Sequence, residues 1–275
     1  MYLITVCGVR NVRSRRATSG VFDKQVDRKP PRRRYGLNRA PEEAADEKMA
    51  AVTDLDLQAP ALHAAGDRVI SPGEMTGLQA LERKQPTMPM GPGRVERREC
   101  EYIRHGTLTL IAHCDVAPGQ VVAPSRGPTR TEEDFGAQIM RTVASAPKAT
   151  RWHVVMDHWN MHQSASLVRL VAKDDKLQED LGQKDKRGIL QSRATRTALL
   201  SAPTHGMVCH YTPQHASGMN QSDMWFSMLV RKLLKRASCT SVEELQAKVL
   251  AFIESFTATM AKPFKWTYGR KPLSV

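Results

Sequence analysis

Short apolar runs and amphipathic stretches alternate along this chain, and each predicts an element. Residues 107–115 (TLTLIAHCD) are apolar and alternating, and residues 116–123 (VAPGQVVA) return after a Pro-Gly turn, which predicts a β-hairpin. Residues 152–156 are apolar without alternation, as in a strand buried on both faces. A first strand is predicted to begin at 69–71 and a late short strand at 208–211. These runs indicate a β-sheet with a buried centre.

Amphipathic segments lie between and after these runs. Residues 131–146 open with Thr-Glu-Glu and carry Phe135, Ile139 and Val143 four positions apart, which predicts a helix with one buried stripe. Further helices are predicted at 41–51, at 164–172 behind a serine cap, at 220–235, and behind the capping residue Ser241. Residues 77–84 fit a second strand or its edge, and 85–94 form a loop because prolines and glycines interrupt them. The order of elements predicts an α/β fold with a mixed sheet flanked by helices.

Length and composition favour one large domain with appendages. The chain has 275 residues, of which 41% are hydrophobic, enough for a substantial core. We expect a basic arm, linker and helical segment at 1–66 and the main domain at 67–275. A charged stretch at about 173–207 is predicted to be a surface insertion in that domain.

Positive charge is concentrated at the N-terminus. The net charge is +13, and residues 1–39 hold 11 lysines and arginines against two aspartates. Such an arm neutralises phosphates and releases counterions, although a solvated tail has the same composition. Candidate DNA contacts are Arg32, Arg33 and Arg34, together with the end of the predicted helix at 220–235, namely Arg231, Lys232, Lys235 and Arg236. In a purely structural interpretation the latter four complement the helix dipole.

The cysteines and the apolar runs bear on the compartment. Five scattered cysteines without a C-x-x-C pair predict reduced thiols and neither disulfides nor a zinc site. His210 and His215 could bind zinc by residue type, but no other spacing supports it. No apolar run reaches the length of about 18 residues that a transmembrane helix needs. We expect a cytoplasmic protein.

Two carboxylates stand where a metal site can form. Asp157 ends the strand at 152–156, and Asp223 lies at the start of the helix predicted at 220–235. A carboxylate at a strand end and one on a following helix can converge on Mg²⁺, which prefers oxygen ligands. Each acid alone is more often a helix cap or a surface charge.

The residues around these acids resemble DDE transposases of the mariner superfamily, in their bacterial insertion-sequence branch. Asp157, Asn160 and His162 match a D-x-x-N-x-H element, and HYTPQH (210–215) followed by Met219-Asn220 leads to Asp223 as the third acid. Further matches are GLQALERK (77–84), RHGTLTLIA (104–112), GPTRTEEDF (127–135) and MAKPFKWTYGRKPL (260–273). The combination is more specific than any one motif.

This resemblance implies a ribonuclease H-like fold and a function. It implies DNA transposition, with metal-dependent cleavage and transfer of strands by Asp157 and Asp223 holding Mg²⁺ or Mn²⁺. Asn160 and His162 would lie beside the metal. The implied partners are double-stranded DNA at transposon ends and further copies of the chain. Residues 1–29 match nothing in the family, whose full-length members carry helix-turn-helix modules there, so a truncated or frameshifted copy is expected.

One position departs from the family pattern. The family's first acid lies in S-x-D-E-x-T-G, and here residues 71–77 read SPGEMTG, with Gly73 in place of the aspartate. Glu74 is near the site, but neighbouring side chains on a strand point to opposite faces, so we expect that it cannot replace the aspartate. Metal binding should be weakened, and Gly73→Asp is expected to restore activity.

Three functions therefore stay open. The first is an impaired DDE transposase catalytic domain. The second is a non-catalytic remnant that binds DNA or intact transposase. The third is a ribonuclease H-like nuclease that uses Glu74 or Asp115 as a substitute acid.

Overall fold

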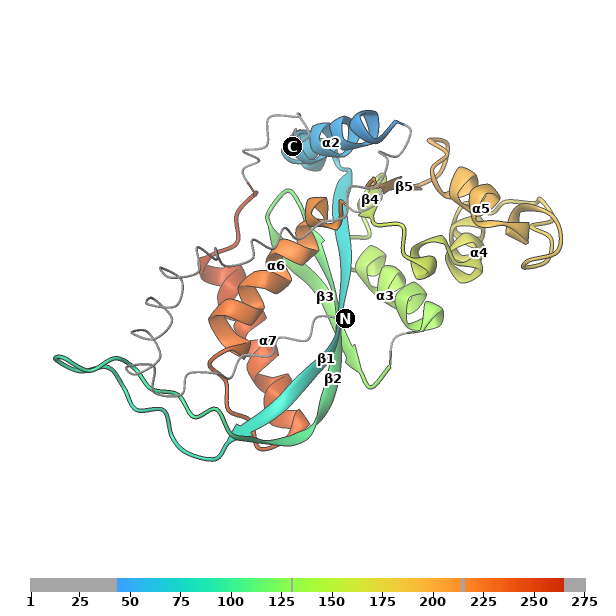
Figure 1. Cartoon of the computed structure of the whole chain (residues 1–275). Helices are drawn as coiled ribbons and strands as arrows, with labels where there is room; N and C mark the ends of the chain where they lie inside the picture. The colour runs from blue at the N-terminus through green and yellow to red at the C-terminus, as the bar shows by residue number, and fades with distance from the viewer. Residues whose placement is uncertain (1–43, 130, 214–215, 265–275) are drawn as a thin grey trace, which may run out of the picture.

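The computed structural model describes residues 44–129, 131–213 and 216–264 (Figure 1). Arg32, Arg33, Arg34 and His215 therefore lie outside the described residues. In chain order the longer elements are α2 (Ala45–Ala65), β1 (Arg68–Arg83), β2 (Tyr102–Asp115), β3 (Gln120–Gly127), α3 (Glu132–Ser145), β4 (Trp152–Met156), α4 (Ala165–Asp174), α5 (Arg193–Leu200), β5 (Met207–Tyr211), α6 (Gln221–Leu229) and α7 (Val242–Thr259). Short helical turns η1 (Asn160–Gln163), η2 (Ile189–Gln191) and η3 (Ser217–Met219) lie between them, and the π-helix η4 (Val230–Leu234) continues α6.

The five strands form one mixed sheet in the order β3-β2-β1-β4-β5. β1 pairs antiparallel with β2, and β2 with β3, whereas β4 runs parallel to both β1 and β5. This order and these directions are those of the ribonuclease H-like fold, so the predicted fold class is confirmed. The carboxyl end of β4, which leads to Asp157, lies between the two strands parallel to it.

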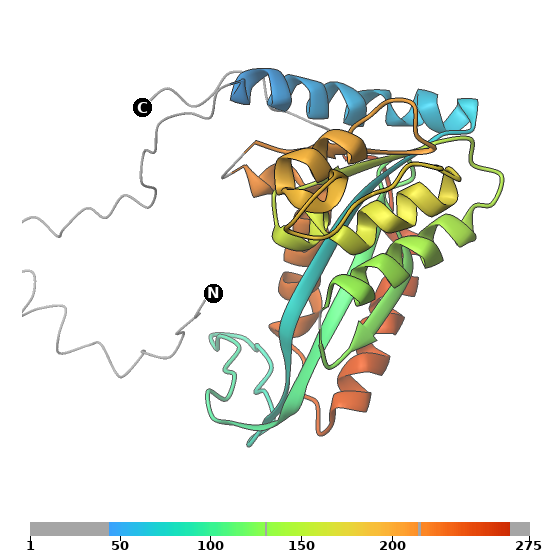
Figure 2. The ribbon, with the colours of Figure 1, turned by 90° about the vertical axis from the view of Figure 1, so that its right-hand side faces the viewer.

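Helices cover both faces of the sheet (Figures 1 and 2). On one face α3 and α4 pack on β4 and β5, with Phe135, Ile139 and Val168 fully buried. On the other face α6 and α7 pack on β1 and β2, with Trp225 and Leu229 at the centre of a second core. Because helices cover both faces of the sheet, the strand at 152–156 is buried on both sides and shows no alternation of apolar and polar residues.

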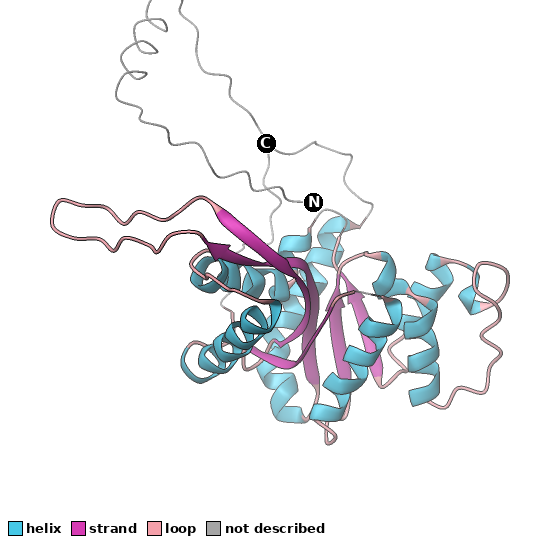
Figure 3. Cartoon of the chain, turned by 90° about the horizontal axis from the view of Figure 1, so that it is seen from below, coloured by secondary structure: helices cyan, strands magenta, loops and turns pink. Residues whose placement is uncertain are grey.

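β1 differs from its prediction. The sequence predicted a strand beginning at 69–71 and a second strand or its edge at 77–84, but β1 runs unbroken from Arg68 to Arg83 because β2 pairs with it along its length. The pairing is irregular between Met75 and Leu78, where Gly77 has a φ of 69°. The β1–β2 hairpin and its connecting loop project from the body of the domain (Figure 3).

The predicted helix caps are mostly confirmed. Thr131 Oγ1 accepts the Asp134 amide at 3.1 Å, and the Asp134 carboxylate accepts the Thr131 amide at 2.9 Å, a complete capping box. Ser164 and Ser241 also cap their helices. The helix predicted at 220–235 begins after the cap Asn220 but changes to the π-helix η4 after Leu229. A pattern of period 3.6 gives no sign of such a change.

The two flanking segments are more closely packed than expected. The insertion at 173–207 buries Leu190 and Leu200 against the core around β4. α2 extends well beyond the predicted 41–51 and packs Val52 and Ala59 against β1 and β4. The domain division at residue 66 stays a prediction. Within the described residues, we find no helix with both the length and the apolar character for a membrane crossing.

Replacing Thr131 by alanine should destabilise the domain by about 1 kcal/mol, because α3 loses its capping hydroxyl. Thr257→Ala, inside α7, is the matched control, since a threonine in a helix interior has a lower helix propensity than alanine. Urea denaturation followed by circular dichroism measures both. Equal midpoints for the two variants would contradict the capping role.

Candidate active site

The first turn of α6 is fixed directly to β1. The Asn220 amide donates to the Pro72 carbonyl at 2.8 Å, and the Ser222 hydroxyl donates to the same carbonyl at 2.9 Å. Ser71 donates its hydroxyl hydrogen to Asn220 Oδ1 and accepts the Ser222 amide. All four residues are buried. This network sets the position of Asp223, the next residue of the helix.

Asp223 lies in the first turn of α6, where the helix dipole favours negative charge. The residue is exposed on one side. Partial burial, followed by the charges of Asp157 and Glu74, nevertheless raises the pKa of Asp223 to about 6. Three carboxyl groups from β1, the end of β4 and α6 are therefore close enough to repel one another.

Asp157 is held in a fixed orientation at the carboxyl end of β4. Its Oδ1 accepts the Trp159 amide at 3.0 Å and lies 2.7 Å from Nδ1 of His162. Burial opposes ionisation of Asp157, but these contacts outweigh it and lower its pKa. Asp157 therefore stays ionised while Asp223 is partly protonated near pH 6.

His162 joins Asp157 to Glu74. The imidazole is 2% exposed, and its Nε2 lies 3.1 Å from Glu74 Oε1. Burial lowers the pKa of His162, yet the hydrogen bonds and charges of Asp157 and Glu74 together raise it to about 9. Near neutral pH a buried imidazolium thus lies between two carboxylates.

Glu74 lies near Asp157 although it does not share the face of Gly73. Strand alternation does hold, since Gly73 faces α6 and Glu74 faces the opposite side. That opposite side, however, is where His162 and Asp157 lie. The sequence signal was an acid at position 74 together with the histidine of the D-x-x-N-x-H element, which was expected only to lie beside the metal.

Gly73 is packed tightly against α6. A Cβ atom at this position would lie 2.6 Å from Ser222 Cβ and 2.9 Å from Phe226 Cε2, so its neighbours would have to move. Gly73→Asp would therefore require Ser222 and Phe226 to shift, and the recovery of activity expected from it stays a prediction. The space that an aspartate side chain would need is filled by the helix that carries Asp223.

The donor set fits a hard cation by chemistry. Asp157 and Asp223 offer oxygen ligands, and their mutual repulsion is the kind that a divalent cation offsets. Among the residues that the structure describes, though, no three His, Cys, Asp or Glu side chains gather at metal-ligand spacing.

The loop after Asp157 is braced from two sides. Tyr211 donates its hydroxyl hydrogen to the His162 carbonyl at 2.9 Å and its ring stacks on His158. Asn160 Oδ1 accepts Arg193 Nη1 at 2.8 Å. Arg193 comes from the insertion and was missed as a neighbour of the site, because nothing in the sequence indicates that residues 160 and 193 meet.

Other candidate residues lie elsewhere. Arg231, Lys232, Lys235 and Arg236 are exposed at the far end of the helix from Asp223. At 1.5 Å per residue they lie about 12–20 Å along its axis. His210 pairs with His153 on the neighbouring strand at 3.1 Å. Asp115, whose pKa is raised by burial, accepts the Ala117 amide and is not part of the cluster around His162.

A comparison with known families identifies the superfamily of this chain. The sequence profile described as DDE superfamily endonuclease matches residues 75–246, more than half of the chain. The chain belongs to the DDE superfamily endonucleases. No curated protein matches it. The profile begins just after Gly73 and Glu74, and it includes Asp157, Asn160, His162 and Asp223.

Solved structures show weaker likeness to this DDE endonuclease domain. The catalytic domain of Mos1 mariner transposase has 10% identity and a TM-score of 0.48, over 83% of this chain and 86% of that one. The Mos1 mariner paired-end complex with Mn has 12% identity and a TM-score of 0.45, over 91% and 72%. The paired-end complex with Mg has 14% identity and a TM-score of 0.34, over 90% and 72%. Likeness at this level does not indicate what this DDE endonuclease domain binds.

Gly73→Asp should destabilise the domain by about 1–3 kcal/mol, the usual cost of overpacking. The double variant Gly73→Asp/Ser222→Gly should be more stable than the sum of the single changes, because removing the Ser222 side chain frees the space. Gly91→Asp is the control, since a Cβ there meets nothing within 4 Å. A double-mutant cycle by urea denaturation measures the coupling, and strict additivity would contradict the packing described here.

The His162 imidazolium should make stability depend on pH between neutral and alkaline conditions. Its folded pKa of about 9 lies above the unfolded value of 6.5, so its contribution is complete below pH 6.5 and is lost as the pH rises through 9. The free energy of unfolding of the wild type, compared with that of His162→Gln at pH 6.5, 8 and about 9.5, measures this contribution. A difference that does not shrink with pH would show that His162 is neutral.

Proposed function

We propose that this chain is the catalytic domain of a DDE-type transposase that cleaves and transfers DNA strands with Mg²⁺ or Mn²⁺. Asp157 and Asp223 are its proposed catalytic and metal-binding residues, with Asn160 and His162 beside them. Its strand-cleavage activity is proposed to be impaired. The substrate is double-stranded DNA at transposon ends, reached in the cytoplasm.

One observation carries this proposal. Asp157, Asp223 and Glu74 come from three separate elements, yet burial together with the charges of Asp157 and Glu74 raises the pKa of Asp223. Carboxylates that repel one another destabilise the fold, and such clusters are found mainly at functional sites. In a chain that belongs to the DDE endonuclease superfamily, that arrangement supports phosphoryl transfer on DNA.

The chain's own residues would orient and polarise the reacting groups. His162 and the Trp159 amide fix the Asp157 carboxylate, and the Ser71–Asn220–Ser222 network fixes the turn that bears Asp223. Divalent cations, when bound, activate the attacking oxygen and stabilise the leaving one. His162, which Asp157 and Glu74 keep protonated, offsets part of the negative charge that a DNA phosphate would meet.

The proposed impairment rests on Gly73. The residue has no carboxylate, and Ser222 and Phe226 fill the space where one would project. A centre for two cations needs several anionic oxygens to offset the repulsion between the ions. The same observation favours the second candidate function, a non-catalytic DNA-binding remnant that competes for transposon ends or assembles with intact copies.

Partners follow from the same proposal. Contacts with DNA are proposed for Arg231, Lys232, Lys235 and Arg236, which are exposed, and for Arg32, Arg33 and Arg34 of the basic arm. The Mos1 structures named above include paired-end complexes. Assembly of this chain into a homo-oligomer on DNA is proposed by analogy.

Nicking of supercoiled plasmid DNA tests the function. The wild-type chain with Mg²⁺ or Mn²⁺ should bind the plasmid but nick it little more than Asp157→Asn does. The double variant Gly73→Asp/Ser222→Gly should nick on the order of a hundredfold faster, as expected for one added charge-stabilising group. Agarose gels of time courses, with chelated metal as the blank, measure the rates.

The outcomes separate the two parts of the proposal. Rapid metal-dependent nicking by the wild type that Asp157→Asn abolishes would contradict the impairment and leave the DDE function standing. Nicking that is equal in the wild type, Asp157→Asn and Asp223→Asn would contradict the assignment of these acids.

A further inference from the structure

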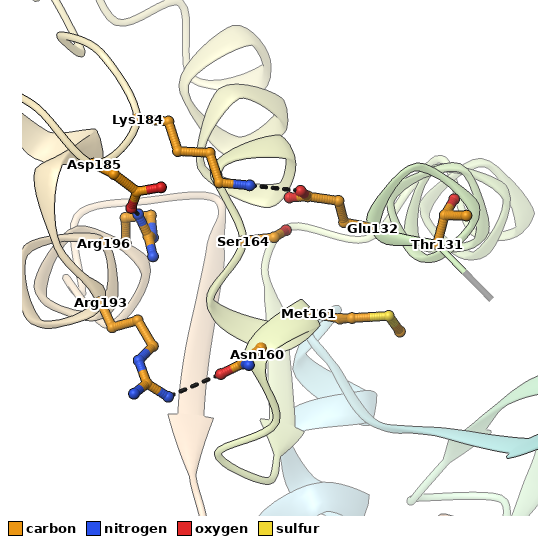
Figure 4. Close-up of a pocket in the computed structure, with 9 residues that line it drawn as sticks. All are labelled: Thr131, Glu132, Asn160, Met161, Ser164, Lys184, Asp185, Arg193 and Arg196. Carbon is orange, nitrogen blue, oxygen red and sulfur yellow. Dashed lines mark hydrogen bonds and ion pairs between the residues drawn. The ribbon is translucent and has the colours of Figure 1, made fainter.

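A cavity of about 540 Å³ lies beside the candidate active site (Figure 4). Thr131 and Glu132 at the start of α3, Ser164 at the start of α4, and Arg193 of the insertion line it. Asn160 and Met161, from the loop that joins Asp157 to His162, form its remaining side. The cavity and the acid cluster therefore share one loop.

The charge of this cavity is unevenly compensated. Its lining includes three cationic side chains, Lys184, Arg193 and Arg196, and two carboxylates. Lys184 is paired with Glu132 at 2.7 Å. Arg196 lies 3.7 Å from Asp185. Arg193 instead donates to the neutral amide oxygen of Asn160 at 2.8 Å, so its charge is left for a ligand.

Arg196 gives the cavity a fixed wall. The side chain is 8% exposed, and its Nε and Nη1 donate to the carbonyls of Gln163 and Leu190 at 2.7 and 2.8 Å. The bond to Gln163 fastens the insertion to the residue after His162, whereas the bond to Leu190 lies within the insertion. Arg193, one turn earlier on α5, is consequently held at the mouth of the cavity even though it is exposed.

Helix ends add to the positive potential. α3 and α4 both begin at the cavity, with their capping residues Thr131 and Ser164 in its lining. The N-terminal end of a helix carries partial positive charge and favours anions. A guanidinium that bonds a carbonyl-type oxygen with one donor keeps others in a planar fork suited to phosphate.

We propose that this cavity binds the backbone phosphates of the DNA strand that passes the Asp157 loop, with Arg193 as the main phosphate contact. The inference rests on the proposed function and adds a role for the insertion at 173–207. Arg193 bonds Asn160, three residues after Asp157, so a phosphate bound at Arg193 is coupled to the loop that carries the acid. A strand is a better fit than one mononucleotide because the cavity continues to this loop.

Arg187 offers a matched control. It belongs to the same insertion, is 71% exposed and pairs with Asp180, but it does not line the cavity. Binding of a fluorescent single-stranded oligonucleotide to the full chain is measured by anisotropy over a salt series in EDTA, where no cleavage occurs. Arg193→Ala should weaken binding about tenfold, as for one charge-assisted hydrogen bond. It should also reduce the salt slope by about 0.7, the value for one phosphate on a single strand.

Arg193→Lys is the second variant. It should keep the salt slope, because the charge stays, but lose part of the affinity, because lysine lacks the fork. Thermal denaturation checks that every variant is folded. Equal effects of Arg193→Ala and Arg187→Ala would overturn the proposal, since the insertion would then act only through its general charge.

The same experiment tests whether the cavity binds a free nucleotide instead of a DNA strand. A fluorescent deoxynucleoside monophosphate should bind far more weakly than the oligonucleotide. If it binds as tightly and depends on Arg193, the ligand is a nucleotide and the DNA-strand proposal is overturned. Failure of the proposed function would appear as no DNA binding by any variant, whereas failure of this inference alone would appear as binding that Arg193→Ala leaves unchanged.

Discussion

The contact between the first turn of α6 and β1 determines the geometry of the candidate site. Asn220 and Ser222 both donate to the Pro72 carbonyl, and they exclude water from the hydroxyl of Ser71. Because these polar groups are buried, losing one partner would leave others unsatisfied. The glycine at position 73 allows this close approach, and the same approach brings Asp223 toward Asp157. A side chain at position 73 and the close contact of α6 with β1 therefore exclude each other, because both would occupy the same space.

The acid cluster is stabilised by a cation that belongs to the protein. The His162 imidazolium lies between Asp157 and Glu74. Burial and the charges of these two carboxylates raise the pKa of Asp223, and they outweigh the opposite effect of His162. The protein thus offsets one of the three negative charges internally, and two carboxylates share that one cation. A bound metal ion would compete with His162 for the Asp157 carboxylate, so the strength of the ion pair bears on metal affinity as well as on stability.

Much of the fold follows from the sequence, because buried strands and capped helices leave local patterns. The strand at 152–156 and the caps Thr131 and Ser164 needed only neighbouring residues to be recognised. The site was less accessible. The motifs indicated Asp157 and Asp223, but the contact of Glu74 with His162 depends on which face of β1 meets η1. That relation is set by tertiary packing, as is the clash that a side chain at position 73 would cause.

The π-helix η4 alters how the end of α6 is oriented. A π-turn adds a residue to the turn, and each residue of an α-helix advances about 100° around the axis. Lys235 and Arg236, which follow η4, therefore point in directions that a helical wheel drawn from Asp223 does not give. The direction of the side chains after η4 is therefore independent of their direction in α6. The first part of the helix orients Asp223, and the part after η4 orients the basic residues separately. A lineage could turn that basic end by gaining or losing one residue in Val230–Leu234 without disturbing the acid.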